Sequence, residues 1–191
     1  KVDMADWFYA PVWKQSVAEP PFKTAASSDP HEMPNSLIFI DECGLGPRLA
    51  ERLKAQGHTV TIVHAADEFQ KISADEYAIS PGQREHYDAL LKSLCEDGRE
   101  VAAIAHLWNV AHDSEPLISD DDFARSQQRG FYSLLFLAQA LGEQFLTRSP
   151  QDGDQAQRSL RLCVVTSNLQ SVTGEETLRP EKATMLGPCR V

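Results

Sequence analysis

The stretch SLIFIDECGLGPRLAERLKAQGHTVTIV, residues 36–63, decides the fold of this 191-residue chain. It opens with the continuous apolar run SLIFID (36–41), which is typical of a strand covered on both faces. GPRLAERLKAQG (46–57) then places leucines four residues apart and ends on a glycine, which predicts a helix and its end. HTVTIVH (58–64) follows as the next strand. The stretch therefore predicts a strand–helix–strand unit with a right-handed crossover.

A second helix is predicted within SPGQREHYDALLKSLCEDG (80–98). Ser80 is the expected N-cap, Pro81 suits the first helical position, and Gln83 completes a capping box. Gly98 is placed to end the helix. Its apolar face is expected to consist of Tyr87, Leu90, Leu91 and Leu94.

The remaining segments continue the alternation of strands and helices. Buried strands are predicted at VAAIAHLW (101–108) and LRLCVVT (160–166), with a long helix near 120–146 between them and a short helix from Pro180. Gly130 lies inside the long helix and indicates close packing against a neighbour. This alternation predicts an α/β fold, a truncated Rossmann-like three-layer structure whose mostly parallel sheet carries helices on both faces.

The chain is expected to be one structural unit over residues 1–191. Residues 1–16 contain an aromatic segment that predicts a separate strand, residues 17–35 read as a proline-rich connector, and residues 36–191 form the α/β body. The apolar ending ATMLGPCRV, residues 183–191, indicates a fragment of a larger protein.

Composition excludes several classes of function. Lys and Arg total 18 against 28 Asp and Glu, for a net charge of −10, so no nucleic-acid partner is expected. No apolar run reaches the length of a membrane span, and the amino terminus is unlike a secretory signal, so the cytoplasm is the expected compartment. The four cysteines form no CxxC pair and are predicted to be reduced core residues, and no metal site is expected.

The glycine-rich turn after the first strand has the shape of a nucleotide-binding loop. Gly44 and Gly46 could provide the tight turn and the close approach of the backbone to a pyrophosphate. Leu49 occupies the third glycine position, however, and Pro47 removes an N–H donor from the helix start. The acidic residue that would bind a ribose is displaced to Asp67. These departures favour a structural turn, with Gly44, Gly46 and Asp67 as weak cofactor-binding candidates.

Other patterns that could carry chemistry favour structural roles. No Tyr is followed four residues later by the Lys that short-chain reductases use to lower the phenol pKa. His106 and His112 lack an established metal-ligand spacing. Asp120, Asp121 and Asp122 suit the first turn of a helix, where the dipole favours negative charge. No catalytic residue is therefore predicted in this chain.

Read in order, several segments resemble the amino-terminal structural half of a ketoreductase region in a modular type I polyketide synthase. The segments are WFYAPVWKQ, SLIFIDECGLGPRLAERLKAQGHTVTIV, YAISPGQREHYDALLKSL, IAHLWNV, LLFLAQAL, LRLCVVTSNLQSVTGEE and RPEKATMLGPCRV. The resemblance implies that this half is non-catalytic and supports a second half, which binds NADPH and carries the catalytic Ser, Tyr and Lys. No cofactor is then expected in this chain.

The resemblance also implies partners. These are the catalytic subdomain of the same polypeptide, an acyl carrier protein and a homodimeric bacterial parent enzyme. Two alternatives remain open from the sequence. One is a free-standing enzyme that binds NAD(P) or S-adenosylmethionine through Gly44, Gly46 and Asp67. The other is a degenerate pseudo-ketoreductase scaffold in a synthase module that does not reduce its substrate.

Overall fold

The computed structural model describes residues 35–111, 119–147 and 160–190. A six-stranded sheet with the order β3-β4-β2-β1-β5-β6 forms its centre, and only β3 runs antiparallel to its neighbour. The predicted aromatic strand and connector lie outside the described residues, as does His112. The strands are β1 (Asn35–Phe39), β2 (Thr59–Ala65), β3 (Gln70–Lys71), β4 (Glu76–Ile79), β5 (Val101–Asn109) and β6 (Arg161–Thr166).

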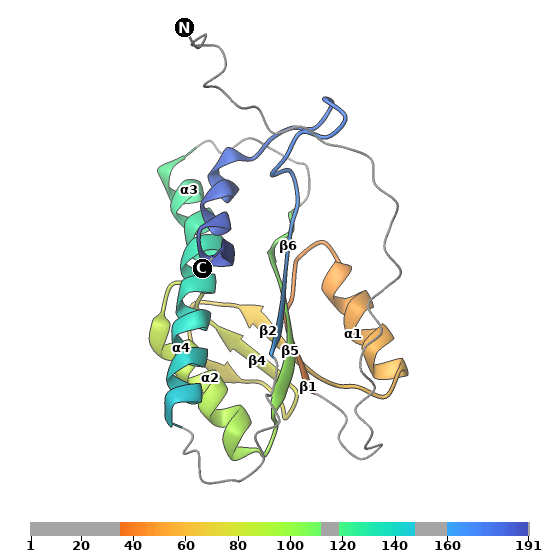
Figure 1. Ribbon diagram of the computed structural model, residues 1–191, viewed down its shortest axis with the longest axis vertical. Helices are drawn as coiled ribbons and strands as arrows, with labels where there is room; N and C mark the ends of the chain where they lie inside the picture. The colour runs from red at the N-terminus through yellow and green to blue at the C-terminus, as the bar shows by residue number, and fades with distance from the viewer. Residues whose placement is uncertain (1–34, 112–118, 148–159, 191) are drawn as a thin grey trace, which may run out of the picture.

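Helices cover both faces of the sheet, as the sequence predicts. Figure 1 shows α1 on one face and α2 with α4 on the other. The C-terminal turns lie on the α4 side, where η3 contacts α3 and η2. The helices are α1 (Leu45–Ala55), α2 (Arg84–Glu96), α3 (Asp120–Gln127), the π-helix η2 (Gln128–Tyr132), α4 (Ser133–Thr147), and the 3₁₀ helices η3 (Pro180–Leu186) and η4 (Pro188–Arg190).

Alternating residues of the central strand supply the two halves of the core. Leu37 and Phe39 of β1 point into the larger apolar cluster beneath α2 and α4, whereas Ile38 points into the smaller cluster beneath α1. All three are fully buried. The α2 face of the larger cluster matches the predicted set, since Tyr87, Leu90, Leu91 and Leu94 are all buried. The α/β fold with a mostly parallel sheet is confirmed.

The start of α2 differs from the prediction. The helix begins at Arg84, with Gln83 at the N-cap and without a side-chain cap. Ser80 and Gln83 instead close a turn, in which the N–H of Gln83 donates to the carbonyl of Ser80 at 3.2 Å. Gly82 within this turn interrupts the helical pattern that the capping-box spacing suggested, because glycine favours turns over helix interiors.

Three further features depart from the sequence-based expectations. The β3–β4 hairpin was not predicted, because β3 has two residues and β4 has four. The long helix contains the π-helical turn η2 between α3 and α4. The cysteines do not act as core residues: Cys95, Cys163 and Cys189 are exposed and Cys43 is half-buried, although all four are free thiols.

Candidate nucleotide-binding turn

The glycine-rich turn lies at the position where Rossmann-like folds bind nucleotides. β1 sits between β2 and β5: α1 connects it to β2 on one side, and α2 later connects β4 to β5 on the other, so the strand order reverses at β1. Ligands of open α/β sheets bind outside the carboxyl ends of the strands at this switch point. The loop from Ile40 to Gly44 joins the carboxyl end of β1 to α1, and is therefore the place to test for a cofactor.

Both glycines have a conformational reason to be glycine. Gly44 adopts a left-handed φ of 88° at the N-cap of α1, where a side chain would be strained. A Cβ on Gly46 would lie 2.5 Å from Cγ1 of Ile40 and 3.0 Å from Oδ1 of Asp41. Gly46 therefore permits helix α1 to pack against the end of β1, a role that the third glycine has in nucleotide-binding turns. The glycine pattern is explained without a nucleotide.

Asp41 supplies an internal anion to the turn. One carboxylate oxygen accepts the backbone N–H of Cys43 at 2.8 Å and of Leu45 at 3.1 Å. The other oxygen accepts the N–H of Gly46. The carboxylate is buried at the start of α1, and Pro47 has no N–H to add. The donors that a phosphate would use are therefore already bound to a negatively charged side chain.

Lys182 lies across the neighbouring strand ends. Its ammonium donates to the carbonyl of Asn109 at 2.8 Å and to the carbonyl and hydroxyl oxygens of Ser167, both at 3.2 Å. Asn109 ends β5 and Ser167 follows β6, so η3 is tied to the carboxyl ends of two strands. The side chain of Asn109 also donates to Sδ of Met185 at 3.0 Å. Buried Lys182 and Met185 thus occupy the carboxyl edge beside the turn.

The cysteine in the turn is poorly suited to nucleophilic chemistry. Burial raises the pKa of the Cys43 thiol, the carboxylates of Asp41 and Glu42 raise it further, and Lys182 opposes them. The thiol lies 3.7 Å from the carbonyl of Val110. A thiol with a raised pKa is protonated at neutral pH and is a weak nucleophile.

Asp67 follows β2 and is exposed. The adjacent N–H of Ala66 donates to the carbonyl of Ile79 at 2.8 Å, so this segment is fixed beside β4. The structure does not test Gly44, Gly46 and Asp67 as cofactor ligands, and they stay predictions. It does show that Asp41, which the sequence analysis did not single out, accepts the backbone hydrogen bonds of the turn.

A buried Ser–His pair lies on the face of β5 that packs against α4. His106 is fully buried and its Nε2 lies 2.9 Å from the Ser133 hydroxyl. Burial lowers the pKa of His106 to about 3. The hydroxyl also contacts the carbonyl oxygens of Arg129 and Gly130, which the π-helical turn brings together. Since the rings of Phe39 and Trp108 pack around His106, this pair has no access to a substrate and serves the core.

Gly130 confirms the predicted close packing. A Cβ at this position would lie 2.8 Å from Nδ2 of Asn109. The π-helical turn therefore lets the helix approach the end of β5, which holds the side chain of Asn109 next to Met185. Such π-helical turns are rare and occur mostly as single turns inside α-helices.

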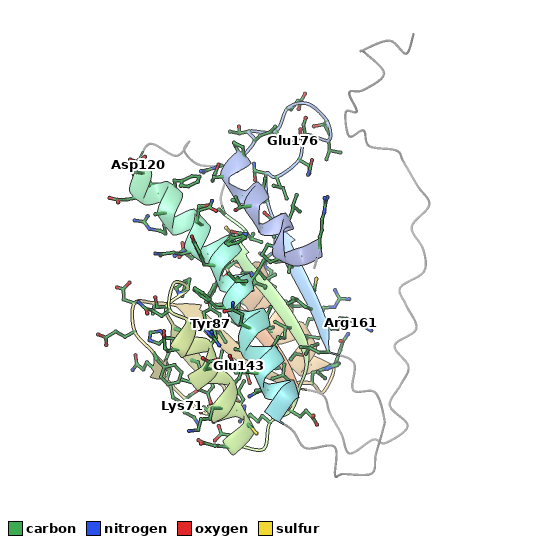
Figure 2. The ribbon with its side chains drawn as sticks, turned by 60° about the vertical axis from the view of Figure 1, so that its left-hand side comes forward. Lys71, Tyr87, Asp120, Glu143, Arg161 and Glu176 are labelled. Atoms are coloured by element: carbon green, nitrogen blue, oxygen red, sulfur yellow. The ribbon has the colours of Figure 1, made fainter. Side chains whose placement is uncertain are left out.

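The structure brings together a Ser, a Tyr and a Lys that sequence spacing did not connect. The Tyr77 hydroxyl lies 3.1 Å from the Ser93 hydroxyl and 3.3 Å from an Asp97 oxygen. Lys71 binds the same Asp97 oxygen at 2.7 Å, and its ammonium lies 5.6 Å from the centre of the Tyr77 ring. Tyr77 is fully buried, so it cannot deliver a proton to a substrate. This cluster instead fastens β3 and β4 to α2, beside the label of Lys71 in Figure 2.

The other polar candidates have structural explanations. The Ser119 hydroxyl accepts the N–H of Asp122 at 3.2 Å and donates to its carboxylate at 2.8 Å, so Ser119 caps α3 and the acidic run forms its first turn. Within residues 35–111, 119–147 and 160–190, no group of three or more His, Cys, Asp or Glu side chains has metal-site geometry. No helix in this part of the chain combines the length and apolar character that crossing a membrane requires.

Comparison with known proteins identifies the family. The model described as beta-ketoacyl synthase-like, N-terminal, matches residues 35–150, which is more than half of the chain. The chain therefore belongs to this family. No curated protein matches the sequence.

Solved structures show which fold the chain shares. It is similar, at 24% identity and a TM-score of 0.66, to an adenylation, ketoreductase and pseudo-Asub multidomain structure of a keto acid-selecting NRPS module, covering 81% of this chain and 12% of that one. A putative short-chain alcohol dehydrogenase from Burkholderia multivorans shares 19% identity at a TM-score of 0.56, with 83% and 75% coverage. An N-terminal ketoreductase from the macrolactin assembly line shares 18% identity at a TM-score of 0.51, and the match covers 62% of this chain and 24% of that one.

These likenesses establish a Rossmann-like fold. The chain spans 12% of the NRPS module structure and 24% of the macrolactin ketoreductase. The predicted resemblance to the ketoreductase region of a synthase is thus supported at the level of fold and family, and the activity of the whole protein is a matter for proposal.

Proposed function

We propose that this chain is the structural, non-catalytic half of a ketoreductase region in a polyketide synthase. Its role is to brace a second half that binds NADPH and reduces β-ketoacyl chains carried on an acyl carrier protein. The observation that carries the proposal is the carboxylate of Asp41, which binds the N–H groups of Cys43, Leu45 and Gly46. A reductase fold whose anion site is filled by its own side chain is suited to packing.

The tyrosines of the described residues support the same role. Catalytic reduction requires a phenol that can release its proton near neutral pH. Tyr87 is fully buried, its hydroxyl donates to the carbonyl of Pro81 at 3.1 Å, and burial raises its pKa. Tyr77 is equally buried. Tyr132, which is exposed, stacks on Phe136 rather than lying beside a lysine four residues later.

A bracing role has a physical rationale. Hydride transfer requires the donor and acceptor to be held close to their reactive geometry, and a packed neighbour that orders the catalytic half provides part of that constraint.

The family's description names a synthase, but acyl transfer to a cysteine needs a thiol of low pKa. In the turn, the pKa of Cys43 is raised. Cys43 is therefore a poor candidate for the nucleophile of an acyl transfer. The proposed parent is a cytoplasmic bacterial homodimer.

The proposal is tested by measuring NADPH-dependent reduction of a β-ketoacyl thioester. Three proteins are compared: residues 1–191, the remainder of the reductase region, and the two joined in one polypeptide. We expect activity from the joined protein, none from residues 1–191, and a large loss when the remainder is produced alone. Turnover by residues 1–191 alone, or full activity of the remainder without them, contradicts the bracing role.

A further inference from the structure

The two edges of the sheet are built differently. At one edge, β3 is short and antiparallel, and Lys71 is fixed to Asp97 of the segment after α2. A short edge strand with a lysine discourages further pairing. At the other edge β6 is a six-residue parallel strand, RLCVVT, with one charge at its start and neither proline nor lysine. The β6 edge lacks the usual features that prevent another strand from pairing with an edge strand.

β6 is also apolar on both faces. Leu162 pairs in register with Ile104 and therefore shares the α2–α4 face, whereas Val165 packs in the cluster beneath α1. Leu162 is 44% exposed and Cys163 is exposed. Parallel strands are normally covered on both faces by helices. Figure 2 shows β6, with Arg161 at its start, as the outermost strand of the described sheet.

The segment after β6 carries two further exposed apolar side chains. Val172 is 58% and Leu178 is 46% exposed. The loop between them is nevertheless ordered, because the Glu176 carboxylate accepts the N–H groups of Val172 at 3.1 Å, Thr173 at 2.7 Å and Gly174 at 2.9 Å. An ordered loop that presents apolar side chains is suited to contact with a partner.

The direction of the crossover indicates how the partner strand runs. The helix that joins β5 to β6 lies on the α2–α4 face, and η3 leaves β6 on the same side. Right-handed crossovers from a strand to its parallel neighbour are nearly universal. A strand that followed η3 and η4 in the same polypeptide would therefore lie parallel to β6, one step further out.

We propose that the β6 edge, defined as Arg161–Thr166 with Val172 and Leu178, binds a parallel strand contributed by the remainder of the reductase polypeptide. The partner is an extended, apolar segment that completes the hydrogen bonding of β6 and covers Leu162. This inference rests on the proposed function for the identity of the partner, and on the geometry of β6 for the site.

Hydrogen exchange tests the proposal in residues 1–191 and in the longer polypeptide that contains the rest of the reductase. We expect the amides of residues 161–166 to exchange at least about 10-fold more slowly in the longer polypeptide, since strand pairing protects them. Residues 76–79 in β4, next to the edge strand on the other side of the sheet, should exchange alike in both proteins. Leu162→Lys should abolish the added protection, whereas Ile72→Lys, at a residue of 48% exposure near β3, should not.

Other outcomes overturn the proposal. Equal exchange of residues 161–166 in both proteins means that no strand adds there. Concentration-dependent protection of residues 1–191 alone identifies a second copy as the occupant. Protection in a monomer that disappears when residues 1–16 are removed identifies the chain's own amino-terminal segment instead.

The reductase assay on the same longer polypeptide separates this inference from the proposed function. If the longer polypeptide reduces the thioester but residues 161–166 gain no protection, strand binding at the β6 edge is refuted and the bracing role still stands. Protection without reduction supports the β6 edge and contradicts the bracing of an active reductase.

Discussion

The carboxylate of Asp41 accepts the backbone N–H of Leu45 at 3.1 Å, at the start of the helix that follows the first strand. In a nucleotide-binding fold, this N–H points toward a phosphate. Here a buried side chain holds the same position, so the geometry of the turn is kept by an internal anion. The relationship explains how a Rossmann-like fold is kept in a chain for which we propose a supporting role.

Removing the Asp41 carboxylate should destabilise the protein. Asp41→Ala leaves the N–H groups of Cys43, Leu45 and Gly46 without their acceptor, which is expected to lower the free energy of unfolding by about 1–3 kcal/mol. Urea denaturation measures the change. Glu42→Gln is the control, because Glu42 is exposed and makes a surface ion pair with Arg129, so a change below about 0.5 kcal/mol is expected. Equal effects of the two substitutions would refute the capping role.

Close-packed Gly46 can be compared with Gly142, which has open space around it. Gly46→Ala should cost about 1–3 kcal/mol in the free energy of unfolding, because its Cβ would collide with Ile40. Gly142 lies in α4 with open space around the position of a Cβ, so Gly142→Ala should stabilise by about 0.5–1 kcal/mol. Thermal unfolding of both variants checks the order. Tolerance of alanine at Gly46 would show that α1 does not depend on this close approach.

Much of the fold follows from the sequence, and the site follows less well. Gly57 and Gly98 end their helices in the left-handed conformation, as their positions after apolar repeats predicted. The hairpin of β3 and β4 was not predicted, because strands this short show too little alternation of apolar and polar residues. The role of Asp41 was not predicted, because it depends on three backbone N–H groups that converge on one side chain. Residue spacing does not reveal this relationship. The contact of Lys71 with Tyr77 likewise arises from strand pairing.

Lys182 should fasten the C-terminal turns to the sheet. Lys182→Met removes the hydrogen bonds to the backbone of Asn109 and Ser167, so the amides of residues 180–186 should exchange at least about 10-fold faster while those of β1 are unchanged. Hydrogen exchange with mass spectrometry measures both regions. Lys92→Met, at an exposed position of α2, is the control. Unchanged exchange of η3 in the Lys182 variant would contradict this anchoring role.

Buried His106 predicts a dependence of stability on pH. Its pKa in the folded protein is about 3, against an ordinary value of 6.5, so the unfolded chain takes up the proton first as the pH falls. Stability is therefore fully present above about pH 6.5 and decreases toward pH 3, with a slope of up to about 1.4 kcal/mol per pH unit.

His106→Leu tests this dependence. The variant should lack the decrease between about pH 6.5 and 5.5, where carboxylates with lowered pKa values in the folded protein, such as Glu176 at about 2, are ionised in both the folded and the unfolded state. The Ser133 hydroxyl keeps its carbonyl partners in the variant. Urea unfolding across this pH range compares the two slopes, and identical slopes would show that His106 is accessible to protons in the folded protein.

Calorimetric titration of residues 1–191 with NADPH tests most directly whether the Asp41 carboxylate has replaced a cofactor. We predict no saturable heat up to about 1 mM NADPH, because the donors of the turn are occupied. Saturable binding with a micromolar Kd that is lost in Gly44→Val would place a nucleotide at this turn and contradict the account.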